Sequence, residues 1–180
     1  MAKNILVVHG SPRSGGNSAQ LADAFMEGAK GAGHEVKLIE VGHAKIAGCQ
    51  ACEYCFGHEG ECVQKDQMQD FYPELRWADV LVFAIPMYYY SYPAQIKAFQ
   101  DRMFCGIAKP FGIKEVALLL TYEDKDPSTA QPLIDSFNVC ANYCKQEVLG
   151  VVAVGSVYEK GAIAGNPGLE EARLLGASIE

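Results

Sequence analysis

Short apolar runs alternate with amphipathic stretches along the whole chain. Runs of this length that end in Gly, Pro or polar residues are typical of buried parallel strands. The run Val80–Ile85 is apolar on both faces, which is typical of a central strand covered by helices on both sides. The pattern predicts five strands, at Asn4–His9, Glu35–Val41, Asp79–Ile85, Glu115–Thr121 and Glu147–Gly155.

Between the strands, apolar residues recur at helical spacing. In the first such stretch, every fourth residue from Leu21 to Ala29 is apolar, and Gly33 follows as a suitable stop. Asp66 can cap a second, short helix, which Pro73 should kink or end early. The predicted helices are 17–32, a segment after Asp66 with Met68, Phe71, Tyr72 and Leu75 on one face, Pro93–Met103, 128–144 and Pro167–Gly176.

This alternation predicts an α/β fold, a doubly wound parallel sheet with helices on both faces. The loops at the carboxyl ends of the first, third and fourth strands should line its crevice. Without repeats or linkers, we expect a single domain over residues 1–180, with an irregular Cys-rich loop at 45–65.

Composition and charge exclude several classes of function. The net charge is −7, with no basic stripe, so nucleic acid is not expected as a partner. No apolar run is long enough for a membrane span, and the N-terminus enters a strand without a signal peptide. Seven cysteines and no export signal indicate a reducing cytoplasm, where clustered cysteines serve metal or redox chemistry.

The Gly-, Ser- and Asn-rich turn at 10–18 follows the first strand and leads into a helix. Such a turn offers backbone N–H groups and a helix N-terminus to a phosphate. It lacks the Lys-Ser or Lys-Thr of a P-loop and the glycine pattern of dinucleotide sites. We therefore expect one terminal phosphate; the alternative is a turn that merely starts a helix. The candidate ligands are Ser11, Arg13, Asn17 and Ser18.

A second candidate loop follows the third strand and contains four tyrosines within Pro86–Tyr92. Their rings can form a platform for an aromatic ring system, with backbone N–H groups available to its carbonyls. The alternative is an ordinary aromatic cluster packed under the next helix.

Together, the two loops resemble those of the NADPH-dependent FMN reductases of the flavodoxin-like superfamily. The matching motifs are the Gly-Ser-Pro-Arg turn with Asn17-Ser18, and Pro86-x-Tyr88-Tyr89 with Ala94-Gln95-x-Lys97 and Asp101-Arg102. The resemblance covers most of the chain. It implies strand order 2-1-3-4-5, one FMN per subunit, NAD(P)H as co-substrate, and a homodimer or homotetramer whose partner subunit covers part of the flavin.

The same resemblance assigns the flavin-binding residues. The phosphate would lie on Ser11, Arg13, Asn17 and Ser18, and the isoalloxazine along Pro86, Met87, Tyr88, Tyr89, Tyr90 and Ser91, facing Thr121 and Tyr122. After Tyr122 the chain departs from the family pattern, because Glu-Asp-Lys-Asp stands where small residues are expected. Negative charge there disfavours an anionic reduced flavin and repels a phosphorylated nicotinamide.

Four cysteines, Cys49, Cys52, Cys55 and Cys62, form a C-x₂-C-x₂-C-x₆-C run. The leading part resembles the ligation of a 4Fe-4S cluster in bacterial ferredoxins, and the run at this position resembles that of the iron–sulfur flavoproteins. Zinc is second choice, and free thiols without any cluster are the other alternative. His43 and His58 are expected at the surface, and Cys105, Cys140 and Cys144 as small core or interface residues.

The function predicted from these features is an FMN-dependent NAD(P)H oxidoreductase, of the flavin or quinone reductase type, in which electrons also pass between FMN and a cluster if one is present. No catalytic acid or base is expected, because the flavin carries the chemistry. The alternatives are a non-enzymatic electron-transfer flavoprotein fed by ferredoxin, and a non-catalytic flavin-binding module. A low-molecular-weight phosphatase is disfavoured, because the turn has no nucleophilic cysteine.

Overall fold

A computed structural model describes residues 1–180. Its centre is a five-stranded, all-parallel sheet with strand order β2-β1-β3-β4-β5. The predicted flavodoxin-like fold class is therefore confirmed. The strands are β1 (Asn4–His9), β2 (Glu35–Glu40), β3 (Val80–Pro86), β4 (Glu115–Thr121) and β5 (Glu147–Val154).

The strand sequences are apolar on both faces because the sheet divides the core into two layers. Along β1, Ile5 and Val7 belong to one buried cluster and Leu6 and Val8 to the other, as the two-residue period of a strand requires. The same division holds along β3 and β4. Both faces of the central strands are thus closed to water, which leaves their carboxyl ends as the place for a site.

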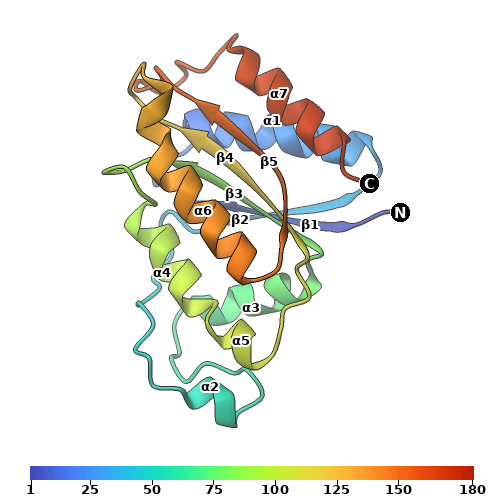
Figure 1. Cartoon of the computed structure of the whole chain (residues 1–180), viewed down its shortest axis with the longest axis vertical. Helices are drawn as coiled ribbons and strands as arrows, with labels where there is room; N and C mark the ends of the chain where they lie inside the picture. Colours follow the sequence, from blue (N-terminus) through green and yellow to red (C-terminus); the bar gives the residue numbers. More distant parts are fainter.

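Helices α1 (Asn17–Gly31) and α7 (Pro167–Ala177) cover one face of the sheet (Figure 1). They approach closely at two glycines. A Cβ on Gly28 would lie 1.9 Å from the carbonyl oxygen of Arg173, and one on Gly176 would lie 2.2 Å from that of Phe25. Any larger residue at either position would force the helices apart.

The other face carries the remaining helices (Figure 1). Three of these helices contribute side chains to the core cluster that contains Leu6 and Val8. These side chains are Met68 and Leu75, Phe99, and Phe137. The helices are α2 (Tyr54–Gly57), α3 (Met68–Trp77), α4 (Ala94–Arg102), α5 (Cys105–Ala108) and α6 (Gln131–Tyr143), the last preceded by a 3₁₀ turn, η1 (Pro127–Ala130).

Several details differ from the sequence-based expectations. Helix α3 continues through Pro73 to Trp77 instead of ending early, because buried Tyr72 and Leu75 hold it against the core on both sides of the proline. The predicted helix over 128–144 begins as a 3₁₀ turn. The four-residue helices α2 and α5 were not predicted, since so short a helix depends on tertiary contacts.

None of the helices combines the length and the apolar composition that crossing a membrane would require.

Candidate functional site

A cleft of about 390 Å³ lies at the carboxyl ends of the strands, within the size range of small-molecule sites. The turn after β1, the loop after β3, the loop after β4 and the loop after β5 all contribute to it. Its lining residues are Ser11, Arg13, Gly16, Asn17, Ser18, Pro86, Met87, Tyr88, Tyr89, Thr121, Tyr122, Glu123, Val157 and Tyr158. Of the predicted flavin-binding residues, Tyr90 and Ser91 are the two that do not line the cleft.

The turn after β1 is shaped to receive an anion. The Ser11 hydroxyl accepts a hydrogen bond from the backbone N–H of Arg13 at 3.1 Å, which folds the turn back on itself. Gly16 then leads into α1, where no side chain caps the first turn. The first N–H groups of a helix have no intrahelical partner, so they are available to a ligand in the cleft, as the sequence predicts.

Asn17 has a structural role that the sequence analysis missed. Its amide nitrogen donates to the carbonyl of Glu159 at 2.9 Å, and its amide oxygen accepts from Gly161 N–H at 3.0 Å and Ile163 N–H at 3.3 Å. The side chain therefore fastens the loop after β5 to the start of α1. It is committed to this loop, so its backbone N–H is the group left for a phosphate.

Arg13 is also turned toward the loop after β5. Its Nη1 donates to the carbonyl of Tyr158 at 3.0 Å, and its guanidinium lies 5.4 Å from the centre of the Tyr158 ring. The side chain is exposed, so it retains further N–H donors for an anion. This places one cation at the mouth of the cleft.

Ser18 belongs to a hydrogen-bonded chain that reaches away from the cleft. Its hydroxyl lies 3.1 Å from Nε2 of His9, and Nδ1 of His9 lies 2.5 Å from Oε2 of Glu40. Ser18 and His9 are both buried, at 2 % exposure each. The apolar run of β1 thus ends in a buried imidazole directly behind the predicted phosphate site, and the sequence analysis assigned it no role.

The loop after β3 forms a tight hairpin. The N–H and carbonyl groups of Tyr88 and Ser91 bond to each other at 3.0 Å, and the two residues between them both have positive φ, 48° at Tyr89 and 59° at Tyr90. Consecutive positive φ values define a type I′ turn, which for bulky residues is strained. Such strain is concentrated at ligand sites.

The hairpin does not form the expected four-tyrosine platform. Tyr88 and Tyr89 line the cleft, but Tyr90 is exposed outside it. Tyr92 packs in the core, and burial raises its pKa to about 12. The reason is that the turn reverses the chain, which leaves Tyr90 outside the cleft and Tyr92 in the core.

The loop after β4 brings one acidic side chain to the cleft, that of Glu123. The other two acidic groups are used within the loop itself. Asp124 accepts from the Thr129 hydroxyl at 2.7 Å, a bond that lowers its pKa, and Asp126 accepts from Ser128 N–H at 2.9 Å. The predicted negative charge at the cleft thus comes mainly from Glu123.

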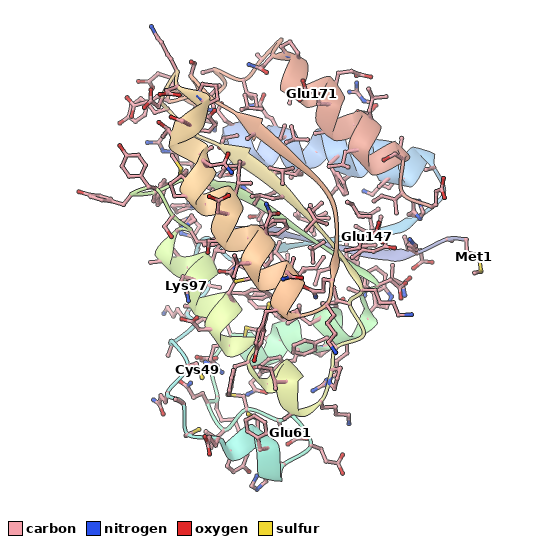
Figure 2. The ribbon with its side chains drawn as sticks, in the orientation of Figure 1. Met1, Cys49, Glu61, Lys97, Glu147 and Glu171 are labelled. Atoms are coloured by element: carbon pink, nitrogen blue, oxygen red, sulfur yellow. The ribbon has the colours of Figure 1, made fainter.

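The four cysteines of the run lie far from α7, at the end of the molecule where Figure 2 labels Cys49 and Glu61. All four line one small pocket, together with Cys105, Arg102 and residues of α2. Cys49 and Cys52 are exposed, whereas Cys55 and Cys105 are buried. Cys105 was expected to be a small buried residue, which is confirmed, but its place as a fifth thiol of this pocket was not foreseen.

Cys140 and Cys144 are exposed on α6, so they do not lie in the core, and the alternative of an interface position stays a prediction. The buried stripe of α6 consists of Leu133, Phe137 and Ala141, and neither cysteine belongs to it. His43 and His58 are at the surface, as expected.

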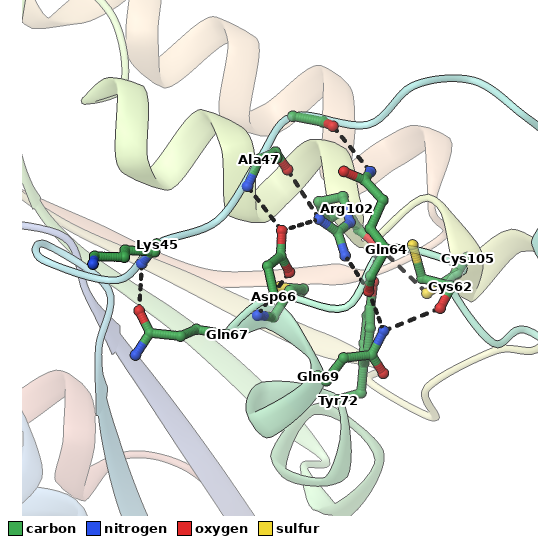
Figure 3. Close-up of polar contacts among 12 residues, drawn as sticks. Lys45, Ala47, Cys62, Gln64, Asp66, Gln67, Gln69, Tyr72, Arg102 and Cys105 are labelled. Atoms are coloured by element: carbon green, nitrogen blue, oxygen red, sulfur yellow. Dashed lines mark hydrogen bonds and ion pairs between the residues drawn. The ribbon is translucent and has the colours of Figure 1, made fainter.

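A buried arginine, Arg102, forms hydrogen bonds with residues at both ends of the cysteine segment (Figure 3). Arg102 Nη1 donates to the carbonyl of Ala47 at 3.0 Å and to Oδ2 of Asp66 at 2.7 Å. Asp66 Oδ2 also accepts from Ala47 N–H at 2.9 Å, and Oδ1 from Met68 N–H at 3.1 Å, the predicted capping contact. Next to it, Lys45 N–H donates to Oε1 of Gln67. We call these paired residues, 45–47 and 66–67, the neck of the segment.

The charges at the neck reinforce each other. Burial by itself would raise the pKa of Asp66, but the Arg102 hydrogen bond and the Ala47 and Met68 N–H groups outweigh it and lower the pKa below its ordinary 3.8. Burial by itself would lower the pKa of Arg102, and the Asp66 hydrogen bond reverses this and raises it. The pair is therefore ionised at neutral pH.

The pocket offers the donor set of an iron–sulfur site. Thiolates are its ligands, and the four cysteines of the run all line this pocket. The Nε–H of Arg102 is buried without a partner beside them and suits a sulfur acceptor. The types of donor in the pocket therefore suit a cluster. No three His, Cys, Asp or Glu side chains are grouped closely enough to hold a metal ion, so a cluster stays a prediction.

With this geometry established, comparison with known proteins identifies the family. Residues 3–158 match the family described as NADPH-dependent FMN reductase. The chain belongs to this family. An iron-sulfur flavoprotein of Methanosarcina thermophila is 31% identical over 165 residues, which cover 91% of this chain and 83% of that protein. Other relatives of the same name match over 42% to 54% of their own length.

Two solved structures of similar shape are oxidoreductases by their titles. An NAD(P)H:quinone oxidoreductase from Methanothermobacter marburgensis has a TM-score of 0.76 at 17% identity, with 100% of this chain and 97% of that one covered. An FMN-dependent NADH-azoreductase from Bacillus anthracis, in complex with FMN, has a TM-score of 0.71 at 12% identity, with 97% and 98% covered. At these identities the likeness shows the fold alone. Membership of the NADPH-dependent FMN reductase family makes this chain an oxidoreductase.

Proposed function

We propose that this chain binds FMN in the cleft and oxidises NAD(P)H there, passing the electrons to a small acceptor such as a quinone. The observation that carries the proposal is that one cleft at the carboxyl ends of the strands joins the anion-binding turn to the loop after β3. FMN, when bound, accepts hydride from NAD(P)H and passes two electrons on.

The protein's own residues bind and orient. The helix N-terminus at Gly16 and the cation of Arg13 hold the phosphate. The Tyr88–Ser91 hairpin presents a fixed wall to the ring system, because its two cross-strand bonds set the backbone. Next to the hairpin, Met87 N–H donates to the carbonyl of Thr121 at 2.8 Å, which holds the loop after β3 against the end of β4.

Glu123 sets the preference among donors. A carboxylate at the cleft repels the additional 2′-phosphate of NADPH more than it repels NADH. We therefore propose that NADH is accepted at least as well as NADPH, although the family is named for the latter.

The cysteine pocket extends the proposal to a second route. We propose that Cys49, Cys52, Cys55 and Cys62 hold a 4Fe-4S cluster, which exchanges single electrons with FMN of the same or a neighbouring subunit. The donor on this route is a protein such as ferredoxin, and the chain acts as an electron-transfer flavoprotein. The name of the Methanosarcina thermophila relative supports this route.

The test is the absorbance spectrum of the protein purified without oxygen, followed by steady-state NADH and NADPH oxidation with a quinone. Two resolved flavin bands with turnover support the reductase. The same bands over a broad shoulder bleached by dithionite, without turnover, support the electron-transfer route. A protein that neither retains nor binds added FMN would contradict both.

A further inference from the structure

A hydrogen-bonded chain runs from buried Ser18 through buried His9 to the exposed Glu40, directly behind the phosphate end of the cleft. The proposed function does not use it. Ser18 lines the cleft, whereas His9 does not. His9 is enclosed by its own strand, by α1 and by β2, and both of its ring nitrogens have partners. A buried imidazole placed between a hydroxyl and a carboxylate is a group that can hold a proton at a defined atom.

The hydrogen-bond partners of His9 require a proton on Nδ1 and allow Nε2 to be either protonated or unprotonated. An ionised carboxylate can only accept, so Nδ1 of His9 carries the proton that it shares with Glu40 at 2.5 Å. Nε2, 3.1 Å from the Ser18 hydroxyl, can either accept from that hydroxyl or donate to it. These two states turn the serine proton in opposite directions.

In the neutral state the Ser18 O–H points at His9 and only oxygen lone pairs face the cleft. In the imidazolium state Nε2–H donates to Ser18, and the hydroxyl proton is released toward the cleft, where it can donate to an anion. The charge of the imidazolium, one residue behind the turn, favours the same anion. Phosphate and the proton on Nε2 therefore stabilise each other.

We propose that His9 is a positioning residue that couples binding of the FMN phosphate to uptake of one proton, with Ser18 as the group that transmits it. The inference rests on the proposed function, because it concerns the phosphate of FMN. It assigns to this site a pH-dependent affinity, in which FMN binds more tightly where His9 is protonated.

Few charged groups surround His9. Glu40, opposite it on β2, is the charged group in contact, and the residue opposite on β3 is Ala84. Ser18 is the contact from α1, and Arg13 is the single charged side chain of the turn at 10–16, where it bonds to Tyr158. The FMN phosphate titrates near pH 6 and becomes more negative as pH rises, which acts in the opposite sense.

The experiment is calorimetry of FMN binding to the full-length apoprotein from pH 6 to pH 8, in two buffers of different ionisation enthalpy. We expect up to one proton taken up per FMN and an affinity that falls by about tenfold over this range. Riboflavin, which lacks the phosphate, should bind with no such dependence. The variants His9→Gln and Ser18→Ala provide the comparison.

Gln in place of His9 can donate to Ser18 but does not titrate, so it should keep most of the affinity and lose the proton uptake. Ser18→Ala should lose both, while leaving His9 in place. A His9→Gln variant with the same proton uptake as the original protein would overturn the inference and leave FMN binding intact. Failure of the original protein to bind FMN at any pH would overturn the proposed function and this inference with it.

Discussion

Arg102 and Asp66 form an ion pair with Nη1 and Oδ2 2.7 Å apart, and the arginine side chain has no exposed surface. A charge in such a place is tolerated only when it is paired and hydrogen-bonded. The pair connects the end of α4 to both ends of the cysteine segment. The conformation of the segment therefore depends on one guanidinium.

Asp66→Asn should lower the free energy of unfolding by about 2–3 kcal/mol, because a buried cation loses its charged partner. Urea unfolding measures the change. Asp70→Asn, an exposed change in the first turn of α3, the helix that Asp66 precedes, is the matched control and should stay within about 0.5 kcal/mol. Equal effects of the two substitutions would contradict the role of the pair.

The same ion pair predicts that the cysteine segment becomes less stable at low pH. Because the pKa of Asp66 is lower in the folded protein than its ordinary 3.8, its stabilising contribution is complete above the ordinary value. It is lost as pH falls through the lower, folded value. The protection of the backbone amides of residues 45–67 against hydrogen exchange, relative to the intrinsic exchange rate at each pH, should therefore fall below about pH 4. The Asp66→Asn variant should show a smaller fall. Protection factors that stay constant with pH in the original protein would refute this.

Cys52→Ser should abolish iron and sulfide incorporation after anaerobic reconstitution, because one of four ligands is lost. Cys52 is exposed, so the fold and FMN binding should remain. Cys144→Ser, an exposed cysteine outside the pocket, is the control and should bind iron like the original protein. Iron and sulfide analysis, with the FMN content, distinguishes these results; iron retained in Cys52→Ser would argue against a four-cysteine cluster.

Arg13→Ala should mainly weaken FMN binding, whereas Asn17→Ala should mainly lower the stability of the fold. The exposed Arg13 contributes charge to the phosphate, so its loss should weaken FMN binding by about tenfold with little change in stability. Asn17→Ala leaves the N–H groups of Gly161 and Ile163 without their acceptor, which should cost about 2–3 kcal/mol of stability. Fluorescence titration with FMN and thermal unfolding of both variants test the contrast, which fails if Asn17→Ala is as stable as Arg13→Ala.

Glu123→Gln should lower KM for NADPH more than KM for NADH, by about three- to tenfold, because it removes the carboxylate from the cleft. Glu171→Gln removes the same charge from the exposed surface of α7 (Figure 2), where Glu171 does not line the cleft, and should change neither constant. The ratio of the two KM values is the measurement. An unchanged ratio in Glu123→Gln would remove the electrostatic basis for donor preference.

Much of the fold followed from local pattern. The apolar run of β3 and the stripe of α1 each depend on residues a few positions apart. Gly33, with φ of 91°, ends α1 as expected. These signals were sufficient to predict the strand order once the turn at 10–18 and the loop after the third strand had indicated the family.

What the sequence did not show depends on contacts between distant residues. The hydrogen bonds of Asn17 join it to residues about 140 positions away, and Val157 and Tyr158 enter the cleft only because β5 ends beside β4. The burial of Arg102 runs against the usual exposure of arginine. The left-handed turn at Tyr89 and Tyr90 contradicts the preference of both residues.

The neck that joins residues 45–47 to 66–67 has a consequence for how such a protein changes over generations. Both ends of the segment are held to each other and to α4, so the chain between them contributes little to holding the sheet together. Doubling the length of a closed loop costs only about 0.6 kcal/mol. Insertions, deletions and exchanged cysteines within the segment should therefore be tolerated while the cleft stays as it is, so the segment and the cleft can diversify independently on one scaffold.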